Sequence, residues 1–507
     1  MRTETDADVV VVGAGPVGTV ALALLGQAGL TAIGIEKDAE PWPTARAVHF
    51  DGETFRTLQS LGIAARLEEV TIPMTSLRVE NEARETLVRI PTGRLGDQGW
   101  HDDINFHQPE VETQLRELVE DTSGVELRVG TEALKVRPAD DGVEVDVLDS
   151  AGVETTLRAR WVIAADGARS PVRQAVGIKS DRFGEDQKWV VVDGHLIDSP
   201  GYEDDMVFLS HHSRPALWVR LPGTRVRMEF MVMPNDDLDE IITPAGVERM
   251  SLGVLPADRF TAERQAIYTF RGRVARQWRS GPVFLAGDAA HQAPPLFGQG
   301  LCAGIRDVVN LIWKFELVAN GSAGDELLDT YESERAPHAR FWVEQAVQAA
   351  LGVQTTDPEI AARRDAAIRT DPTSLAPVSP RLGPGLHTGA VNTRAGGLSI
   401  QPVLADGCRL DDRLGSGFIV VATTQTYDAL DTATRSRLER DDHIVVLRDA
   451  EPGARQLLEA SEAIGLVIRP DRYIFGTASS PAELTELVNL IPGFSPHPGY
   501  TAIGTDL

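Results

Sequence analysis

The spacing of hydrophobic and polar positions changes along the chain, and the first pattern is typical of an α/β fold. The apolar run Val9–Val12 is typical of a buried parallel strand. Residues 19–29 continue as an apolar helix, and residues 31–36 form a second short strand that ends at Glu36. A strand, a helix and a second strand in this order predict a βαβ unit with a parallel sheet.

A second pattern begins near residue 186, where consecutive predicted strands replace the alternation of strands and helices. Here Val226, Met228 and Phe230 alternate with charged residues. A period of two indicates strands with one buried face. We therefore expect an antiparallel sheet in this region, and we expect the segment 75–105 to join it.

The last third of the chain keeps neither pattern over a long stretch. A helix is expected over 331–351, and residues 352–395 indicate a linker with one short helical piece at 358–369, because they are rich in Pro, Gly, Thr and Ala. The elements expected beyond the linker are a strand at 417–424, a helix near 429–440, a strand at 443–449, a hairpin at 463–476 and a final helix at 480–490.

Composition and charge narrow the class of protein and its partners. A chain of 507 residues has enough sequence for about two to four domains. The net charge of −26 argues against nucleic acid, which binds basic surfaces. No run approaches the ~20 apolar residues of a membrane span, and the N-terminus lacks the pattern of a secretory signal. We therefore expect a cytoplasmic protein without a nucleic-acid or membrane partner.

The two cysteines, Cys302 and Cys408, lie far apart in the sequence. Neither belongs to a CxxC motif or to a zinc-binding spacing, so the sequence predicts no disulfide framework and no metal site. If the protein carries out redox chemistry, a bound cofactor must supply it.

The clearest chemical signal is the glycine pattern G-x-G-x-x-G at Gly13, Gly15 and Gly18, between the first strand and the first helix. The first glycine allows a tight turn, the second lets the backbone approach a pyrophosphate, and the third permits close helix–strand packing. Glu36 ends the second strand, where a carboxylate binds a ribose and disfavours a 2′-phosphate. The pattern predicts a site for the ADP half of FAD or NAD.

Two later stretches place an aspartate directly after a strand, where open α/β sheets bind ligands. Asp166 follows an expected strand at 161–165, and Asp288 follows the apolar segment 281–286. The second stretch, GDAAHQAPPLFGQGLCAG, also holds His291. Nothing elsewhere completes a metal shell, so we expect His291 to be a structural hydrogen bonder.

Together the three motifs resemble the FAD-dependent aromatic hydroxylases of the p-hydroxybenzoate hydroxylase type. The motifs are GAGPVG at 13–18, D-G-x-x-S-x-x-R at 166–173 and G-D-A-A-H…P…G-Q-G at 287–300, in the order of that family. The resemblance covers roughly residues 5–350 and is greatest to the 3-(3-hydroxyphenyl)propionate hydroxylase group. The supporting stretches are 46–62, 106–115, 227–234 and 304–314.

The resemblance implies an enzyme whose cofactor performs the difficult chemistry. NADH or NADPH would reduce FAD, and the reduced flavin would add O2 to form a C4a-hydroperoxide that hydroxylates a phenolic ring. NAD(P)H would bind transiently, because the sequence has no second complete G-x-G-x-x-G. Three alternatives stay open: a polyketide-type phenol as substrate, another flavin oxygenation such as epoxidation or Baeyer–Villiger chemistry, and FAD binding without catalysis. The W-x-W-x-I-P signature of the halogenases is absent, which argues against that branch.

The implied fold class is a multidomain α/β (α+β) protein. Its parts are a Rossmann-like FAD-binding domain at 1–74, 106–185 and 266–351, an antiparallel-sheet substrate domain at 75–105 and 186–265, the linker 352–395, and a C-terminal domain at 396–507. The C-terminal domain resembles the thioredoxin-like tail of many of these hydroxylases, but it lacks CxxC, which excludes a dithiol role. Packing, contacts in a possible homodimer and support of a lid stay open for it.

The resemblance also assigns residues to the cofactor. Within that set Glu36 would bind the adenosine ribose and Asp288 the ribityl chain, and a helix opening around Leu301 would direct its N–H groups to the anionic edge of the reduced flavin. The full set is Gly13, Gly15, Pro16, Val17, Gly18, Glu36, Lys37, Arg46, Gln108, Ala133, Asp166, Asp288, Pro295, Gly298, Gly300, Leu301 and Cys302.

The sequence does not single out a catalytic side chain. A phenol reacts more readily as phenolate, so a histidine or tyrosine could act as a base, and an arginine could bind a substrate carboxylate. For each such residue the alternative is an ordinary sheet position. The catalytic candidates are Arg46, His211, Arg220 and Tyr268, and the further pocket candidates are His195, Trp218 and Met231.

Overall fold

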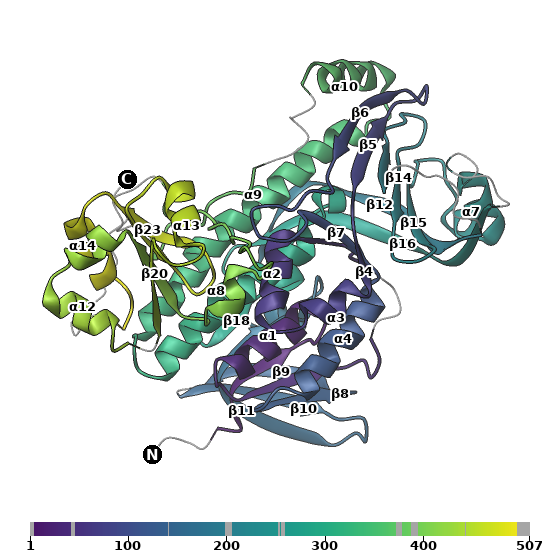
Figure 1. Cartoon of the computed structure of the whole chain (residues 1–507). Helices are drawn as coiled ribbons and strands as arrows, with labels where there is room; N and C mark the ends of the chain where they lie inside the picture. Colours follow the sequence, from purple (N-terminus) through teal and green to yellow (C-terminus); the bar gives the residue numbers. More distant parts are fainter. Residues whose placement is uncertain are drawn as a thin grey trace.

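The computed structural model describes most of the chain. The described residues are 5–41, 46–139, 141–197, 205–251, 254, 259–371, 378–386, 394–441 and 443–493. Figure 1 shows three sheet-bearing regions: one near the N-terminus, one around β12 to β16, and one built from the C-terminal part of the chain. None of the helices in these ranges has the length and apolar character needed to cross a bilayer.

The first region is an eight-stranded sheet, called here the parallel sheet. Its main path runs β17-β18-β11-β1-β2-β8, and β8, β2, β1, β11 and β18 are parallel neighbours. An antiparallel hairpin, β9–β10, extends from β11. The bounds are β1 Ala7–Val12, β2 Ala32–Glu36, β8 Val125–Val129, β9 Glu132–Ala139, β10 Gly142–Leu148, β11 Glu154–Ala164, β17 Arg279–Ser280 and β18 Val283–Leu285.

The predicted βαβ unit is confirmed, with helix α1 at Pro16–Gln27 between β1 and β2. The buried positions of β1 and β2 are apolar, and helices cover the sheet. Buried side chains of α1, of α4 (Gln108–Glu120) and of α8 (Gln299–Ala319) form one core with the strands. Since β1, β11 and β18 are parallel, the loops that follow them meet at one edge of the sheet.

The second region is an eight-stranded sheet, called here the antiparallel sheet, in the order β19-β16-β12-β15-β14-β13-β5-β6. All its pairs are antiparallel except β13 with β5. The bounds are β5 Ser76–Glu80, β6 Thr86–Pro91, β12 Ser180–Leu196, β13 Met206–Leu209, β14 Ala216–Arg220, β15 Arg225–Met231, β16 Phe260–Ala275 and β19 His291–Gln292. The expected antiparallel sheet is therefore confirmed.

Only part of the segment 75–105 joins this sheet. Strands β5 and β6 do, but β7 (Asp103–Phe106) pairs with β3 (His49–Asp51) and β4 (Thr71–Pro73) in a separate three-stranded sheet. The expectation for the end of the segment was wrong because the chain lies against α2 (Gly52–Ser60) before α4 begins. There Trp100 packs on Phe55 and donates a hydrogen bond to Gln59.

The two faces of the antiparallel sheet differ in what covers them. The outer face carries Val190, Trp218 and Met228, which share a core with helices α6 (Leu238–Ile241) and α7 (Pro244–Ser251). The inner face is the opposite one. Its Leu217 packs in a small apolar cluster with Leu296, from the 3-10 turn between β19 and α8, and with Ile368 of α10 (Pro358–Thr370). The inner face therefore meets the loops at the edge of the parallel sheet.

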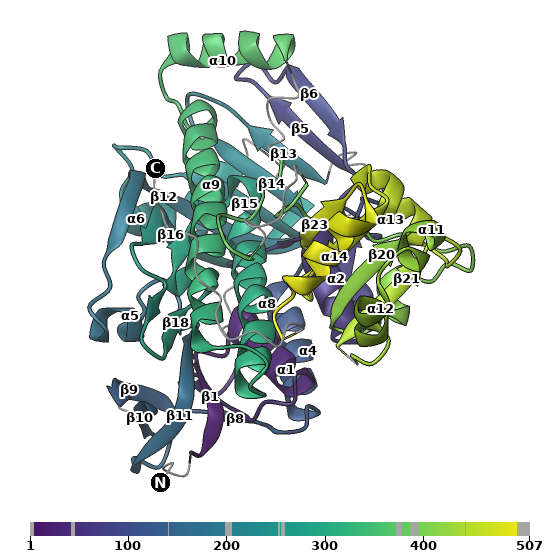
Figure 2. The ribbon, with the colours of Figure 1, turned by 90° about the vertical axis from the view of Figure 1, so that its left-hand side faces the viewer.

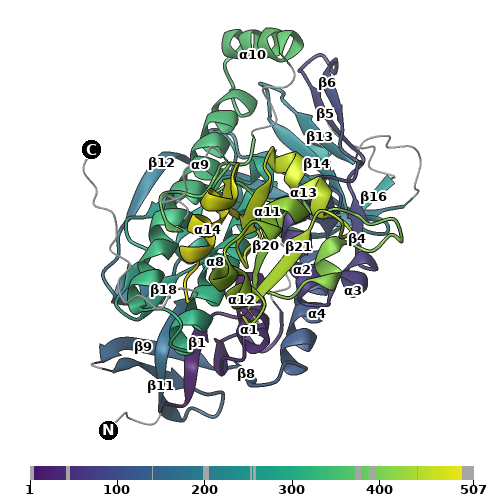
Figure 3. The same cartoon turned by 60° about the vertical axis from the view of Figure 1, so that its left-hand side comes forward.

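Two long helices connect the regions. Figure 2 shows α8 and α9 (Thr330–Val353) running side by side between the antiparallel sheet and the C-terminal part of the chain. The helices expected at 331–351 and 358–369 are confirmed as α9 and α10, and α10 lies against β6 at one end of the molecule (Figure 3).

The C-terminal region is a four-stranded sheet in the order β21-β20-β22-β23. The first two strands are parallel and the last two form an antiparallel hairpin, as the sequence predicted. The bounds are β20 Phe418–Ala422, α11 Thr424–Asp428, α12 Thr432–Leu438, β21 Ile444–Arg448, α13 Ala454–Ser461, β22 Gly465–Ile468, β23 Ile474–Ala478 and α14 Pro481–Asn489. Helices α11 and α13 were not predicted, because each is short. The thioredoxin-like character of this region stays a prediction.

Candidate functional site

The loop after β1 approaches the loop after β11 closely. Gly13 has φ of +94°, and a Cβ there would lie 2.5 Å from the carbonyl oxygen of Ala165. A Cβ on Gly18 would lie 1.9 Å from the oxygen of Gly13. Gly15 differs, because a Cβ there would meet no described atom within 4 Å. The loop is thus closely packed at Gly13 and Gly18, and it leaves space for a ligand in front of Gly15.

The start of α1 is also left open. Its N-cap is Gly15, no side chain of the described residues caps it, and its first turn has no acidic residue. The first N–H groups of a helix then lack protein acceptors, and together with the helix dipole they favour an anion. Pro16, Val17 and Gly18 form this first turn, in the position expected for pyrophosphate binding.

Glu36 holds the glycine loop in place. One carboxylate oxygen accepts a hydrogen bond from the N–H of Ala14 (2.8 Å), and the other accepts one from Asp38 (3.0 Å). Each carboxylate oxygen keeps a lone pair for a further donor such as a ribose hydroxyl. The N–H of Thr131 donates to the Glu36 carbonyl (2.9 Å), which brings the start of β9 and the half-buried Ala133 to this corner. Lys37 is exposed.

Asp166, in the loop after β11, has one bonded and one unbonded oxygen. Oδ2 accepts from the N–H of Val172 (3.0 Å), whereas Oδ1 is buried and has no partner among the described residues. Burial raises the pKa of Asp166. A buried carboxylate oxygen without a partner is costly, and this one lies beside the Gly13 turn.

Arg173, the last residue of the D-G-x-x-S-x-x-R motif, ties two loops together. Its guanidinium donates to the carbonyl of Ala289 (2.7 Å) and to the carbonyl of Ala168 (3.1 Å). The loop after β11 and the loop after β18 are thereby fixed relative to each other. The motif contains this arginine, but the sequence alone does not indicate its role.

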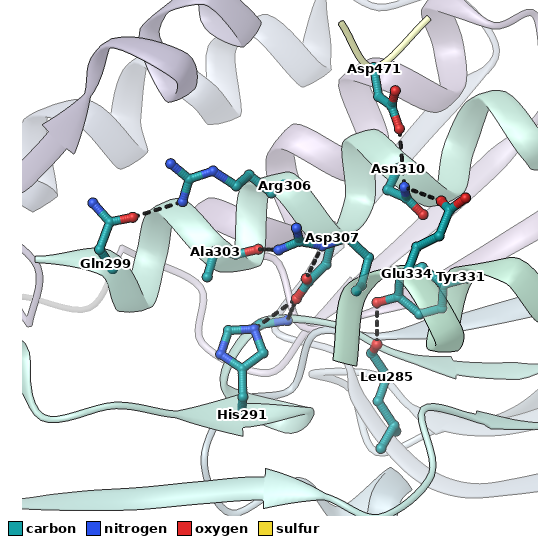
Figure 4. A network of polar contacts seen from close by, with 12 residues as sticks. Leu285, His291, Gln299, Ala303, Arg306, Asp307, Asn310, Tyr331, Glu334 and Asp471 are labelled. Carbon is teal, nitrogen blue, oxygen red and sulfur yellow. Dashed lines mark hydrogen bonds and ion pairs between the residues drawn. The ribbon is translucent and has the colours of Figure 1, made fainter. Parts of the chain in front are cut away.

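The third loop carries Asp288 and His291, and the two behave differently. Asp288 is half-buried, and burial raises its pKa, while nearby His291 and Arg46 oppose that change. His291 is buried, and its Nε2 hydrogen-bonds Asp307 of α8 at 2.9 Å (Figure 4). Asp307 also accepts from the N–H of Gly287 and from Arg335 of α9. His291 is therefore a structural hydrogen bonder, as expected.

The start of α8 is shaped by Gly298. It has φ of +63°, and a Cβ there would lie 2.5 Å from Nδ1 of His49. Gly300, in the first turn, has no described atom within 4 Å of a Cβ position, and the first turn has neither a capping side chain nor an acid among the described residues. Leu301 is half-buried, and Pro295 begins the short 3-10 turn before the helix. A second uncapped helix start thus faces open space.

Cys302 is fully buried under this turn. Its sulfur lies 3.9 Å from the carbonyl oxygen of His49 and 3.8 Å from that of Gly298. Burial alone would lower the pKa of His49, but its hydrogen bond to Asp103 raises that pKa to about 10. His49 was not among the predicted site residues, because nothing in the sequence near it indicates that it lies beneath the Gly298 turn.

Gln108 positions the segment that carries Arg46. Its side-chain oxygen accepts hydrogen bonds from the backbone N–H groups of Arg46 (2.6 Å) and Ala47 (2.8 Å). Its amide nitrogen donates to Glu112 (2.5 Å), a carboxyl whose pKa is raised by burial. The structure therefore joins Gln108 and Arg46 through the backbone.

A polar cluster on the inner face of the antiparallel sheet faces Arg46. Arg227 is 1% exposed, donates to Asp193 at 2.7 and 3.1 Å, and donates to the Arg46 carbonyl at 3.1 Å. Arg264 also pairs with Asp193 (2.9 Å) and lies 3.4 Å from the hydroxyl of Tyr268. The cluster links the sheet to the Arg46 segment and, through it, to Gln108.

The pocket candidates divide between the two faces. Tyr268 lies on the inner face beside this cluster, and Met231 shares that face, because both pair with Trp189 in the sheet register. His195, at the end of β12, is partly exposed and bonds Thr224.

Three candidates lie away from the inner face. Trp218 is 2% exposed within the outer core. His211 lines an outer-face cavity of about 380 Å³, with its Nε2 3.3 Å from Glu80. Arg220 is exposed and pairs with Asp205. Sequence alternation separates the faces of a strand but does not say which face meets the cofactor loops.

Three residues of the inner face, Asp193, Arg227 and Glu229, were missed as site residues. The signal was present in the strand pattern, where charged residues alternate with apolar ones. Such residues are normally solvent-facing, but here both faces of the sheet are covered, so the charged side is buried as well.

The chemistry of the site fits a dinucleotide with a flavin ring. Open space lies in front of Gly15 and Gly300, both helices that begin there are uncapped, and Asp166 presents an unbonded oxygen. Uncapped helix starts favour a pyrophosphate and an anionic ring edge. Among the described residues no group of three or more His, Cys, Asp or Glu side chains is arranged to hold a metal.

Fold and site together define a flavoprotein class, and comparison with known proteins agrees. A family model described as "FAD binding domain" matches residues 6–346. The chain belongs to this family, and it is an FAD-dependent aromatic hydroxylase.

Two relatives and one solved structure show the range of the likeness. The chain is 32% identical to the probable NADH-specific resorcinol 4-hydroxylase of Rhodococcus jostii (strain RHA1), over 97% of this chain and 96% of that protein. It is 31% identical to the 3-(3-hydroxy-phenyl)propionate/3-hydroxycinnamic acid hydroxylase of Mycolicibacterium smegmatis (strain ATCC 700084 / mc(2)155), over 94% and 91%. The crystal structure of the flavin-dependent monooxygenase PieE, 22% identical, shares the fold with a TM-score of 0.83, over 97% of this chain and 99% of that one.

Proposed function

We propose that this protein uses FAD and NADH to hydroxylate the ring of a small phenol, of the size of resorcinol or a 3-hydroxyphenyl acid. The observation that carries the proposal is the composition of the inner face. One polar cluster, Arg227, Asp193 and Tyr268, shares this face with Leu217, which belongs to an apolar cluster with Leu296. Such a surface suits a flat apolar ring with one or two polar substituents.

The names of the relatives support this substrate class. One is a probable NADH-specific resorcinol 4-hydroxylase, and others are hydroxylases of 3-(3-hydroxyphenyl)propionate and 3-hydroxycinnamic acid. These names describe phenols with a second polar group on or near the ring. They also favour NADH over NADPH as the reductant.

The proposed cofactor contacts follow from the open positions of the site. Gly13, Gly15 and the first turn of α1 would hold the pyrophosphate, with Asp166 on the same side. Glu36, Lys37 and Ala133 would surround the adenosine. These three positions meet where β2 ends and β9 begins.

The ring half of the cofactor would lie at the loop after β18. Asp288 would bind the ribityl chain, and Pro295 and the backbone of Gly298, Gly300, Leu301 and Cys302 would line the ring. The uncapped start of α8 would place N–H groups at the ring's anionic edge. Arg46, held by Gln108, would add a positive charge close by.

When bound, reduced flavin supplies the activation of O2 that this reaction needs. NADH contributes two electrons, one oxygen atom enters the ring as hydroxyl, and the other leaves as water. The protein orients the ring and excludes water. Leu217 and Leu296 provide the dry surface, and the Arg227 cluster provides the polar anchor.

The test is a substrate-stimulated oxidation assay with product identification. The purified protein should be yellow and should oxidise NADH faster than NADPH when a suitable phenol is added, with a product heavier by one oxygen atom by mass spectrometry. The panel should hold resorcinol, 3-(3-hydroxyphenyl)propionate, 3-hydroxycinnamate and a polycyclic polyketide phenol. If the polycyclic phenol alone gives product, the small-phenol proposal is wrong. If FAD binds but no phenol accelerates oxidation, the hydroxylase proposal as a whole fails.

Two further proposals rest on the sequence: a cytoplasmic location, from the small number of cysteines, and a homodimer. Light scattering on the purified holoenzyme would decide the second, and a mass of one chain would reject it.

A further inference from the structure

Glu229 lies at the centre of the antiparallel sheet, on its inner face. In the register of the sheet it is directly opposite Val191 of β12 and Leu217 of β14. Directly paired residues of neighbouring strands point to the same face. Because Leu217 shares an apolar cluster with Leu296, from the 3-10 turn just before α8, Glu229 is on the side that meets the proposed ring site.

The carboxyl of Glu229 is buried and has no strong partner. The residue is 6% exposed. Among the described residues, no group donates a hydrogen bond to it, and its nearest cation is Nη1 of Arg227 at 4.0 Å. A buried carboxylate without a hydrogen-bond partner destabilises the folded protein unless another molecule bonds it.

The neighbouring cations are already engaged. Arg227 donates two hydrogen bonds to Asp193 and one to the Arg46 carbonyl, and Arg264 also pairs with Asp193. The charged groups that act on Glu229 are Arg227, which favours its carboxylate, and Asp193, which opposes it. Val191 and Leu217, which pair with Glu229 in the sheet, are apolar.

We propose that Glu229 is a catalytic residue that accepts the hydroxyl proton of the phenol, and that Arg227, held by Asp193, is a positioning residue for it. This inference rests on the proposed function, because it needs a phenol on the inner face. It assigns a base where the sequence suggested a histidine or tyrosine, with His211 and Tyr268 as candidates. His211 lies on the outer face of the sheet.

The step is a single proton transfer. The phenol O–H bond breaks, its electron pair stays on the phenolic oxygen, and a new O–H bond forms on the Glu229 carboxylate. The phenolate is more electron-rich and attacks oxygen more readily. After hydroxylation, the ring carbon loses its proton and the product oxygen takes up one proton, so these two changes cancel. The proton held by Glu229 goes to the second oxygen atom of O2, which leaves as water, and Glu229 is again a carboxylate.

Burial makes Glu229 suitable for this step. It raises the pKa of Glu229 to about 7, against the opposing effect of Arg227. A general base works best when its pKa lies near the working pH, since it is then both ionised and basic. An exposed glutamate would be a much weaker acceptor for a phenolic proton.

The test compares Glu229→Gln and Glu229→Asp with the unchanged enzyme and with Glu185→Gln. Glu185 is on β12, and its side chain is 88% exposed, so it controls for the loss of a carboxylate from the same sheet. The probe is the phenol that gives most product with the unchanged enzyme, together with its ring-fluorinated analogues. The measured quantity is the rate of product formation in a single turnover of the reduced holoenzyme with O2.

We expect Glu229→Gln to retain FAD and to form product about 100-fold more slowly or worse at neutral pH, in the range of a lost general base. KM should change little, Glu229→Asp should be intermediate, and the rise of rate with pH through about 7 should be absent from Glu229→Gln. The deficit should shrink as fluorine makes the hydroxyl more acidic, since an acidic phenol needs less help.

Two outcomes would overturn the assignment of Glu229. One is a Glu229→Gln enzyme with the unchanged rate and pH profile. The other is a deficit of the same size for every fluorinated phenol, which indicates a structural role. If the unchanged enzyme makes no product from any phenol, the proposed function fails first. If Glu229→Gln does not fold, the Glu229→Asp enzyme and its fluorinated series decide the question alone.

Discussion

Two buried charge clusters in this protein are built in opposite ways. At the contact between α8, α9 and the C-terminal region, Glu334 accepts hydrogen bonds from Lys314 (2.8 Å), Arg469 (2.8 and 2.7 Å) and Asn310 (2.9 Å). Asn310 also bonds Asp471, as Figure 4 shows. On the inner face of the antiparallel sheet, Glu229 has Arg227 at 4.0 Å and no hydrogen bond from the described residues.

The two glutamates are equally hidden but titrate in opposite directions. Burial alone would raise the pKa of Glu334, yet Arg469 and Lys314 lower it well below its usual range. Burial does raise the pKa of Glu229, because Arg227 is divided between Asp193 and the Arg46 carbonyl. Pairing, not depth, decides the charge state of a buried carboxyl. The paired cluster holds two regions of the chain together, and the unpaired one is available to a ligand.

The largest effect is expected at the paired cluster. Glu334→Gln leaves Lys314 without its carboxylate partner and Arg469 with Asp471 alone. Removing one partner of a buried ion pair destabilises a protein by ~3–5 kcal/mol. Urea unfolding of the holoenzyme at pH 7 would measure this loss. Because the pKa of Glu334 is lowered on folding, its stabilisation is present above the unfolded pKa and disappears as pH falls through the folded one.

A matched control for this change is Glu344→Gln on the exposed side of α9. A surface change of this kind alters stability by about 0.5 kcal/mol or less. Equal effects of the two substitutions would show that the cluster does not hold the C-terminal region.

The opposite pH dependence is expected for Glu229. Folding raises its pKa from 4.5 to about 7, so the folded state binds more protons than the unfolded state between these values, and stability falls as pH rises across that window. A pKa difference of this size corresponds to about 3 kcal/mol. Glu229→Gln should therefore gain stability relative to the unchanged protein when pH is raised from 5 to 8. Denaturant unfolding at both pH values measures this gain, and an unchanged difference would contradict the unpaired state of Glu229.

A smaller effect is expected at Asp288. Its pKa is raised by burial, and in the proposed site its carboxylate bonds the ribityl chain. Asp288→Ala should weaken FAD binding by about 1–3 kcal/mol, the usual consequence of removing one partner from a charged hydrogen bond. Equilibrium dialysis with FAD gives the affinity directly. Asp288→Asn is the companion variant, since it keeps the shape and one acceptor and should lose less.

The smallest effect is expected at His211. Because it lines a cavity on the outer face, His211→Gln should leave kcat/KM with the best phenol within about twofold, the size of an ordinary surface change. Steady-state oxidation of NADH measures it. A large fall in kcat with FAD retained would mean that substrate reaches the outer face and would reverse the assignment of the two faces.

Local sequence patterns predicted much of the parallel sheet and its loops. The glycine pattern, the strand that ends at Glu36 and the strand that ends just before Asp166 were predicted. A helix opening around Leu301 was also predicted, and α8 begins two residues earlier, at Gln299. Each depends on neighbours within a few residues, such as a turn that needs a positive φ or a strand that must be apolar on both faces. Short helices such as α13 were not predicted, because eight residues are too few to show a clear helical periodicity.

The sequence by itself thus determined the flavoprotein fold, the three loops at the edge of the parallel sheet, and the two faces of each antiparallel strand. Only the tertiary structure decided which face meets those loops. It placed Trp218 and His211 on the outer side and brought Glu229 to the inner side. The reason is physical. Alternation along a strand determines which residues share a face, but the segments that cover each face lie more than fifty residues away in the sequence, such as Leu296 and the Arg46 backbone.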